Sequence, residues 1–224
     1  MSSMLGGRSG NRGRCAGTCR LPFDLYENGT KLNQRGQNYL LSPKDLCTIR
    51  ELPELIGHGV DSLKIEGRMK QPEYVGTVTR IYRKYVDLYE SGQLYQVDEE
   101  DEKELLELFN RGGFTSGYYK KHNGRDMMSL YRPNHQGIFV GKVQSVQGRH
   151  IMFQAAEDLG KGDVLEISLE RGEKVELTSP DIWKKGDKVC LNGQKLKHLK
   201  PGMRIFRTKN QGGRESEKEI ERKY

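Results

Sequence analysis

The feature that most limits how this chain can fold is the segment Asn11–Arg20, which reads NRGRCAGTCR. It separates Cys15 from Cys19 by three residues and embeds both in arginines and glycines, which is typical of an exposed loop. A Cys-x3-Cys pair in such a loop can turn both sulfurs toward one metal ion or cluster, and nearby arginines lower a thiol pKa. The alternative is two ordinary reduced thiols. A zinc ribbon is disfavoured, because a second Cys-x2-Cys knuckle is absent.

Length and composition restrict the class of protein. The 224 residues, 34% hydrophobic and 31% charged, suffice for one large domain or two small ones with a buried core. No run of about 18 apolar residues occurs, which excludes a membrane span. The N-terminus lacks an apolar core of signal-peptide length. Four cysteines without a regular framework argue against a secreted disulfide scaffold. We therefore expect a cytoplasmic protein.

The charge is unevenly placed along the chain. The formal net charge is +7, but residues 98–107 carry seven acidic side chains and one lysine, which leaves +13 on the remainder. A basic surface of this size is compatible with a polyanionic partner such as RNA. Many basic proteins bind no nucleic acid, so charge alone does not decide the partner.

A hairpin and two short helices are predicted after the loop of residues 1–20. Residues 21–26 alternate between apolar and polar side chains, Asn28-Gly29 is a strong hairpin turn signal, and a return strand would end at residues 39–41. Ser42-Pro43 resembles a helix start and would place Cys47 in the first turns of a helix. A second short helix follows and ends at the glycines of residues 57–59.

A strand between helices is predicted next. Residues 60–65 read as a short buried strand, with Glu66 and Arg68 at its carboxyl end. Pro72 opens a long amphipathic helix that ends at Ser91-Gly92, and its many tyrosines fit packing on a sheet better than base stacking. Helix, strand, helix is the unit of an α/β barrel, whose functional groups lie at the carboxyl ends of strands. Glu66 and Arg68 are thus candidate catalytic residues, with a surface ion pair as the alternative.

A second glycine-rich motif follows the acidic stretch. Residues 103–109 predict a helix, and residues 110–119 form a loop with Asn110, Arg111 and several aromatic residues. Such a loop can approach a phosphate or nucleotide closely, although a simple connection explains it nearly as well. Residues 120–134 are irregular, and we interpret them as a linker region.

From about residue 135 the chain predicts short strands separated by turns. A weak repeat places a glycine turn before an alternating strand at residues 160–167, 184–191 and 199–206, as in a small closed β-barrel. Cys190 and Trp183 are expected to pack in this part. The Lys- and Glu-rich residues 209–224 are expected to be a disordered tail or connector.

These motifs together resemble the collagenase-like peptidase family of unassigned catalytic type, number thirty-two in the peptidase classification. The matching segments are residues 7–15 (GRSGNRGRC), Cys19-Arg20, 41–47 (LSPKDLC), 62–70 (SLKIEGRMK), 109–114 (FNRGGF) and 132–137 (RPNHQG). The resemblance covers about residues 5–210 and is closest to long members of the family.

The resemblance implies the fold class and the domains. Residues 1–134 would be the C-terminal part of a TIM-like α/β barrel, 135–208 a small all-β barrel domain, and 209–224 a charged connector. In the family the barrel begins well upstream of the Asn-Arg-Gly-x-Cys motif, so we expect that Met1 is an internal start.

The resemblance also implies two functional alternatives. One is a collagenase-like endopeptidase, for which no catalytic residues are agreed. The other is hydroxylation of tRNA or rRNA, with a [4Fe–4S] cluster in some members. On that pattern Cys15 and Cys47 match cluster ligands, Cys19 is an adjacent candidate, and two further ligands would lie upstream.

The residues favour the RNA-directed alternative. The five histidines lie in turn-like or basic surroundings without a recognisable Ser or Cys context, and no His-Glu-x-x-His zinc helix occurs. We therefore expect an Fe–S-dependent RNA-hydroxylating enzyme, with a peptidase and a non-catalytic RNA- or protein-binding module as alternatives. The substrate-binding candidates are Arg8, Arg12, Arg14, Arg20, Lys64, Asn110 and Arg111.

Overall fold

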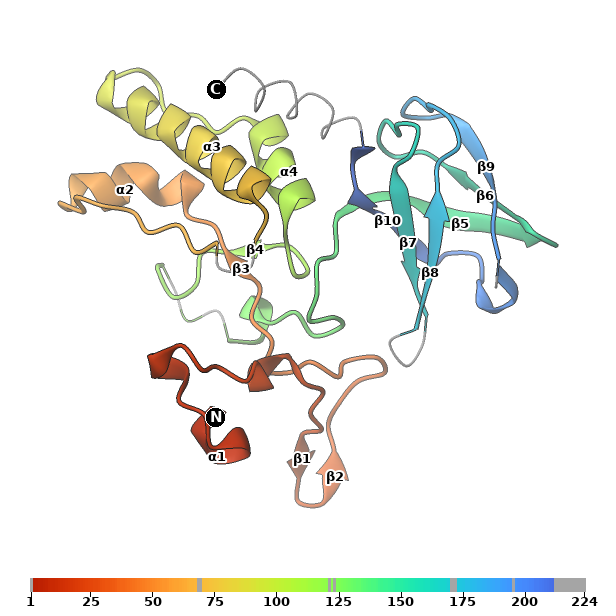
Figure 1. Cartoon of the computed structure of the whole chain (residues 1–224), viewed down its shortest axis with the longest axis horizontal. Helices are drawn as coiled ribbons and strands as arrows, with labels where there is room; N and C mark the ends of the chain where they lie inside the picture. The colour runs from red at the N-terminus through yellow and green to blue at the C-terminus, as the bar shows by residue number, and fades with distance from the viewer. Residues whose placement is uncertain are drawn as a thin grey trace. The chain divides into compact units, whose positions relative to one another are not determined.

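The computed structural model describes residues 2–67, 70–120, 122, 124–169, 173–194 and 196–211 (Figure 1). The chain divides into two compact units. Unit 1 comprises Met1–Cys47 and Asn110–His135, and unit 2 comprises Thr48–Phe109 and Gln136–Tyr224. Among the described helices, none combines the length and the apolar character that crossing a membrane requires. The predicted tail at residues 212–224 lies outside the described residues.

Unit 1 consists mainly of loops held by short elements. Its helical turns are α1 (Ser2–Gly6), η1 (Gly10–Arg12), η2 (Thr18–Arg20) and η4 (Gly124–Met127), and its strands are β1 (Tyr26–Glu27), β2 (Thr30–Lys31), β3 (Asp45–Leu46) and β4 (Phe114–Thr115). The predicted hairpin turn is confirmed, but its strands are only two residues each, and the strand at residues 21–25 and the return strand ending at residues 39–41 do not form. Asn28 (φ 49°) and Gly29 (φ 78°) both adopt the left-handed conformation that this tight turn requires.

The helix predicted at Ser42-Pro43 is wrong. Asp45–Leu46 is instead a short strand, β3, which pairs in parallel with β4. The backbone N–H groups of this segment donate outside it: Lys44 to the Met127 carbonyl at 2.8 Å and Cys47 to the Thr115 carbonyl at 3.0 Å. Because these donors are used by partners far along the chain, no local i to i−4 ladder forms. Met127 belongs to the stretch of residues 120–134 that was expected to be a linker. Its hydrogen bond with Lys44 packs this stretch against the β3 segment within unit 1.

The buried strand predicted at residues 60–65 is also wrong. Residues 60–67 have no strand pairing in the described structure, and Val60 and Leu63 are each 38% exposed. An alternating apolar pattern becomes a strand only when a neighbouring strand takes up its backbone hydrogen bonds. The α/β barrel to which this strand was assigned stays a prediction.

The helices of unit 2 form a packed layer. They are η3 (Ile49–Glu51), α2 (Leu52–Gly57), α3 (Pro72–Glu90) and α4 (Glu99–Leu108). The long helix α3 is confirmed, and its tyrosines pack, although the helix packs mainly on α2 and α4 and not on the predicted sheet. Tyr85 is 1% exposed, and the Tyr82 hydroxyl accepts the Thr48 N–H at 3.0 Å. Asp98 caps α4 by accepting the Glu100 N–H at 2.9 Å, and the acidic first turn suits the positive end of the helix dipole.

A buried carboxylate joins α3 and α4 and gives the unit a pH-dependent contribution to stability. Asp101 accepts hydrogen bonds from Lys84 at 2.5 Å and from the Tyr85 hydroxyl at 2.6 Å. Burial alone would raise the pKa of Asp101, but these hydrogen bonds outweigh it and lower that pKa. The contribution is therefore present above the pKa of the unfolded chain, about 3.9 for Asp, and is lost as pH falls through the folded value.

We expect Asp101→Asn to flatten the acid limb of the stability profile. The free energy of unfolding of the wild type should fall more steeply below about pH 4 than that of the variant, because only the wild type takes up this proton on unfolding. Guanidinium unfolding at several pH values measures the slope. Lys84→Met should reduce the slope in the same direction, and identical slopes in all three proteins would contradict the assignment.

A six-stranded antiparallel sheet forms the rest of unit 2, in the order β8-β7-β10-β5-β6-β9 (Figure 1). Its strands are β5 (Ile138–Gln147), β6 (His150–Gln154), β7 (Val164–Ser168), β8 (Lys174–Thr178), β9 (Lys188–Asn192) and β10 (Arg204–Lys209), with η6 (Leu196–His198) before β10. The sheet curls into a half-barrel around an apolar core that includes Val140, Phe153, Leu165 and Ile205. The overall fold is mixed α/β, and in the described residues β8 and β9 are the sheet edges, with no hydrogen bonds between them to close a barrel.

The predicted repeat is confirmed as a repeated turn. Before β7, β9 and β10 the chain makes a four-residue turn whose third residue is Gly162, Gly186 or Gly202, with φ of 87°, 96° and 87°. This left-handed third position is the one that a type II turn reserves for glycine. Trp183 packs against the core as expected. Cys190 does not pack: it is exposed, because Val189 and Leu191 point inward on the same strand.

Candidate functional site

The three N-terminal cysteines all lie in unit 1. Cys15 is exposed in the loop after η1, and its sulfur accepts the Gly17 N–H at 3.4 Å and lies 3.5 Å from the Ser2 hydroxyl. The hydrogen bond with Ser2 and then that from Gly17 lower the pKa of the Cys15 thiol, and Arg8 adds to this. The pKa of the Cys15 thiol is thus lowered mainly by hydrogen bonds, and the arginine effect that the sequence predicts is a smaller contribution.

Cys19 lies beside an anchored arginine. It is half-buried in η2, next to Arg20, whose guanidinium donates to the Ser42 hydroxyl and the Pro43 carbonyl, both at 2.6 Å. Burial lowers the pKa of Arg20, the positive charge of Arg111 lowers it further, and Cys19 and Asp45 oppose this. Cys19, Asp45 and Arg111 therefore lie close enough to Arg20 for their charges to change its pKa.

The Asn-Arg-Gly-Gly motif is clamped to β3. The Arg111 backbone N–H donates to Asp45 at 2.8 Å, and its guanidinium forms an ion pair with the same carboxylate. Asn110 is 1% exposed and closes the turn by accepting the Gly113 N–H at 2.8 Å. Gly113 has φ 98°, which glycine adopts without strain. The clamp seats the motif beside the β3 segment, two residues before Cys47.

Unit 1 therefore brings Cys19, Arg20 and Arg111 to the segment that carries Cys47. Asp45 is the residue that sequence reasoning did not select, although it holds Arg111 and belongs to the conspicuous LSPKDLC segment. Arg20, Asn110 and Arg111 use polar atoms in contacts within the protein, so their role in substrate binding stays a prediction. Arg8, Arg12 and Arg14 are exposed around the cysteine loop.

The remaining candidates lie in the irregular segment of unit 2. Glu66 is exposed and pairs with exposed Lys64 at 3.7 Å, the geometry of the surface-ion-pair alternative. Arg68 lies outside the described residues. Catalytic roles for Glu66 and Arg68 stay predictions.

The described residues alone do not make a cluster or metal site. Within the described ranges, no group of three or more His, Cys, Asp or Glu side chains is placed to hold a metal ion. Cys15, Cys19 and Cys47 offer thiolate donors of the type that an iron–sulfur cluster needs. They would supply only part of the ligand set of such a cluster.

Comparison with known proteins decides the family. Residues 1–129, which contain the cysteine loop, the β3 segment and the Asn-Arg-Gly-Gly turn, match peptidase family U32. The chain belongs to this family. No solved structure matches it.

Relatives within the family carry two kinds of name. An uncharacterized protease of Methanocaldococcus jannaschii is 32% identical over 92% of this chain, and a collagenase of Porphyromonas gingivalis is 30% identical over 88%. The tRNA hydroxylation protein P1 of Bacillus subtilis is 32% identical over 82% of the chain. The aligned region covers 54%, 54% and 46% of these relatives, so the chain spans about half the length of the curated relatives it matches.

Proposed function

We propose that this member of family U32 belongs to an enzyme that hydroxylates structured RNA, with tRNA as the first substrate class to test. The supporting observation is the arrangement of unit 1. Arg20 and the Arg111–Asp45 clamp fix the segments that carry Cys19 and Cys47. The relative named for tRNA hydroxylation supports the reaction class.

The residues of unit 1 divide into two roles under this proposal. Arg8, Arg12 and Arg14 are exposed and bind RNA phosphates, to which arginine donates in a bidentate geometry. Cys15 and Cys47 supply thiolates to a [4Fe–4S] cluster, with Cys19 as an adjacent candidate and the remaining ligands outside these residues. When bound, such a cluster supplies one-electron redox chemistry.

The alternative function is a collagenase-like endopeptidase. Relatives carry this name, and the described structure has a thiol–imidazole contact in which the Cys190 sulfur lies 4.0 Å from Nδ1 of His150. Cys190 is exposed on the outside of the sheet, and the contact is too long for a hydrogen-bonded nucleophile and base. The geometry therefore gives peptidase chemistry less support than RNA modification.

The proposal predicts hydroxylation that depends on Cys47. We would express the full-length protein, including the residues that carry the remaining cluster ligands, in a bacterial strain that lacks its own tRNA hydroxylation gene and analyse tRNA nucleosides by mass spectrometry. A nucleoside with one added oxygen should appear with the wild type, vanish with Cys47→Ser and fall in Arg12→Gln/Arg14→Gln. Cys190→Ser is the matched thiol control and should keep wild-type levels.

A gelatin cleavage assay separates the two functions. The purified chain should not cleave gelatin under the proposed function. The peptidase would replace the RNA proposal if three results are obtained together: the wild type cleaves gelatin, Cys190→Ser does not, and tRNA stays unmodified.

A further inference from the structure

The outer face of the sheet in unit 2 carries an aromatic cluster on its two central strands. Phe206 on β10 is directly opposite Phe139 on β5, and Arg204 is opposite Lys142. The two rings lie 6.1 Å apart edge to face, and the Arg204 guanidinium lies 5.0 Å from the centre of each. Ile205, between Arg204 and Phe206, points into the core, so the cluster faces outward. We call Phe139, Phe206 and Arg204 the aromatic platform.

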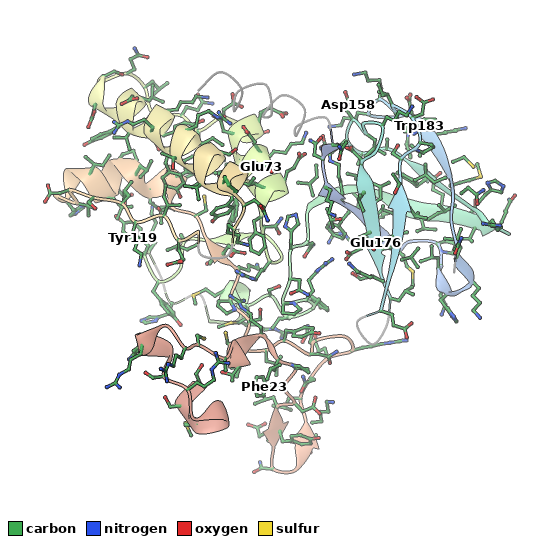
Figure 2. All side chains as sticks on the ribbon, in the orientation of Figure 1. Phe23, Glu73, Tyr119, Asp158, Glu176 and Trp183 are labelled. Carbon is green, nitrogen blue, oxygen red and sulfur yellow. The ribbon has the colours of Figure 1, made fainter. Side chains whose placement is uncertain are left out.

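The two platform strands, β5 and β10, and the strands β6 and β9 are basic and contain no acidic residue, whereas β7 and β8 on the other side of β10 do. Residues 136–156 and 188–211 together include nine lysines and arginines without one Asp or Glu, whereas residues 157–187 carry nine acids. Figure 2 shows one of these acids, Glu176, on β8. Glu166, the cross-strand neighbour of Phe206, is 3% exposed and is neutralised by Lys174 at 2.9 Å.

The cations in residues 136–156 and 188–211 also differ from other cations of unit 2 in whether they form ion pairs. Within the described structure, none of the following exposed cations takes part in an ion pair: Lys142, Arg149, Lys188, Lys197, Lys200 and Arg204. Elsewhere in unit 2, basic side chains do pair with carboxylates: Arg50, Arg80, Arg83, Lys84, Lys103 and Lys174. A group of cations without internal counter-charges, next to two aromatic rings in edge-to-face contact, complements a polyanion that also presents flat faces.

A shallow hollow adds to this surface. It has a volume of about 440 Å³ and lies between the β5–β6 turn and the segment after β9. Arg149 and Lys197 line it together with Gly148, Gly193, Gln194 and Leu196. This combination of small, apolar and cationic lining residues suits a sugar–phosphate segment.

We propose that the aromatic platform binds an unpaired segment of RNA. One or two bases stack on Phe206, Phe139 and the guanidinium of Arg204, and the neighbouring phosphates meet Lys142, Arg149 and Lys197. An unpaired strand fits because its bases are available for stacking, whereas a duplex hides them. The choice of RNA as the polyanion rests on the proposed function, and the surface would serve to hold a substrate RNA.

The test is a binding titration of the complete chain with fluorescent RNA. We would compare an unpaired oligonucleotide of about 12 nucleotides with a duplex of the same length at several salt concentrations. Phe206→Leu should weaken binding of the unpaired RNA about tenfold with an unchanged salt dependence, because it removes stacking and no charge. Arg204→Gln should weaken binding similarly and also reduce the slope of log K against log salt by about 0.7.

Controls separate loss of the surface from loss of the fold. Arg83→Gln removes an exposed arginine that is already paired with Asp87, so it should bind RNA like the wild type. The fluorescence of Trp183, the only tryptophan, verifies that each variant keeps its sheet. Wild-type affinity in both platform variants, or equal weakening in Arg83→Gln, would overturn the inference.

The outcomes also distinguish this inference from the proposed function. If tRNA is hydroxylated but the platform variants bind RNA with wild-type affinity, the RNA-binding role of the platform is wrong and the proposed function stands. If RNA binding depends on Phe206 but no hydroxylated nucleoside is found, the proposed function is wrong and the RNA-binding role of the platform stands.

Discussion

Gly137→Ala is expected to destabilise unit 2 by about 3–5 kcal/mol. Gly137 precedes β5 with φ 73°, a left-handed conformation that costs other residues about 1–2 kcal/mol. A Cβ atom there would also lie 1.8 Å from the carbonyl oxygen of Arg207 and 2.6 Å from its carbonyl carbon. Both atoms belong to the backbone of β10, so the overlap cannot be relieved by turning a side chain. The central β5–β10 pair must shift instead.

Guanidinium unfolding followed by Trp183 fluorescence measures this effect, because this single tryptophan packs against the sheet core. Gly148→Ala is the matched control. Gly148 has φ 59°, and nothing lies within 4 Å of the Cβ it would gain. It should therefore show only the conformational cost, about 1–2 kcal/mol. Equal destabilisation by the two alanines would show that the close backbone approach at Gly137 is unimportant.

Local signals in the sequence predicted the local structure well. The Asn28-Gly29 turn, the helix from Pro72 to Ser91 and the three glycine turns before β7, β9 and β10 all formed where expected. Each depends on the conformational preference of one or two residues or on the period of one apolar face. Such preferences need no knowledge of the rest of the fold.

The wrong predictions concern segments whose state depends on distant partners. Residues 42–47 carry a good helix start, but Met127 and Thr115 take up their N–H groups and make a strand. Residues 60–65 carry a strand pattern without a paired neighbour in the described structure. Cys190 was placed in the correct strand but with the wrong orientation, because a short apolar run does not show which alternate residues face the core.

At the candidate site, too, the sequence indicated local features but not contacts between distant residues. Cysteines among arginines predicted an exposed loop, and Cys15 is exposed in unit 1, but the site itself stays a prediction. The clamp between Asp45 and Arg111 joins residues 66 positions apart, so no local pattern could reveal it. The aromatic platform was missed for a related reason. Phe139 and Phe206 become neighbours only through the β5–β10 register, while the sequence showed merely that the region is basic.

Arg207 is the second position at which a large effect is expected. It is 7% exposed and joins three parts of unit 2: it forms an ion pair with Glu107 on α4, a second with Asp163 at 3.0 Å, and a hydrogen bond to the Asp158 carbonyl at 2.7 Å. Asp163 is fully buried and also accepts backbone N–H groups from Gly160 and Gln211, both at 2.9 Å. The network therefore fixes the turn before β7 and the helix α4 against β10.

Arg207→Met should cost about 3–5 kcal/mol, because it leaves two buried or half-buried carboxylates without their shared cation. Arg207→Met/Glu107→Gln should recover part of that loss, since one stranded charge is removed with the arginine. Arg83→Met on α3 is the matched control: its partners are exposed, and the expected cost is below about 1 kcal/mol. Trp183-monitored unfolding of these three variants and of Glu107→Gln alone gives the comparison. A double variant as unstable as the sum of its singles would mean that Arg207 acts through its packed aliphatic stem, and that the charges on α4 and β10 are not coupled.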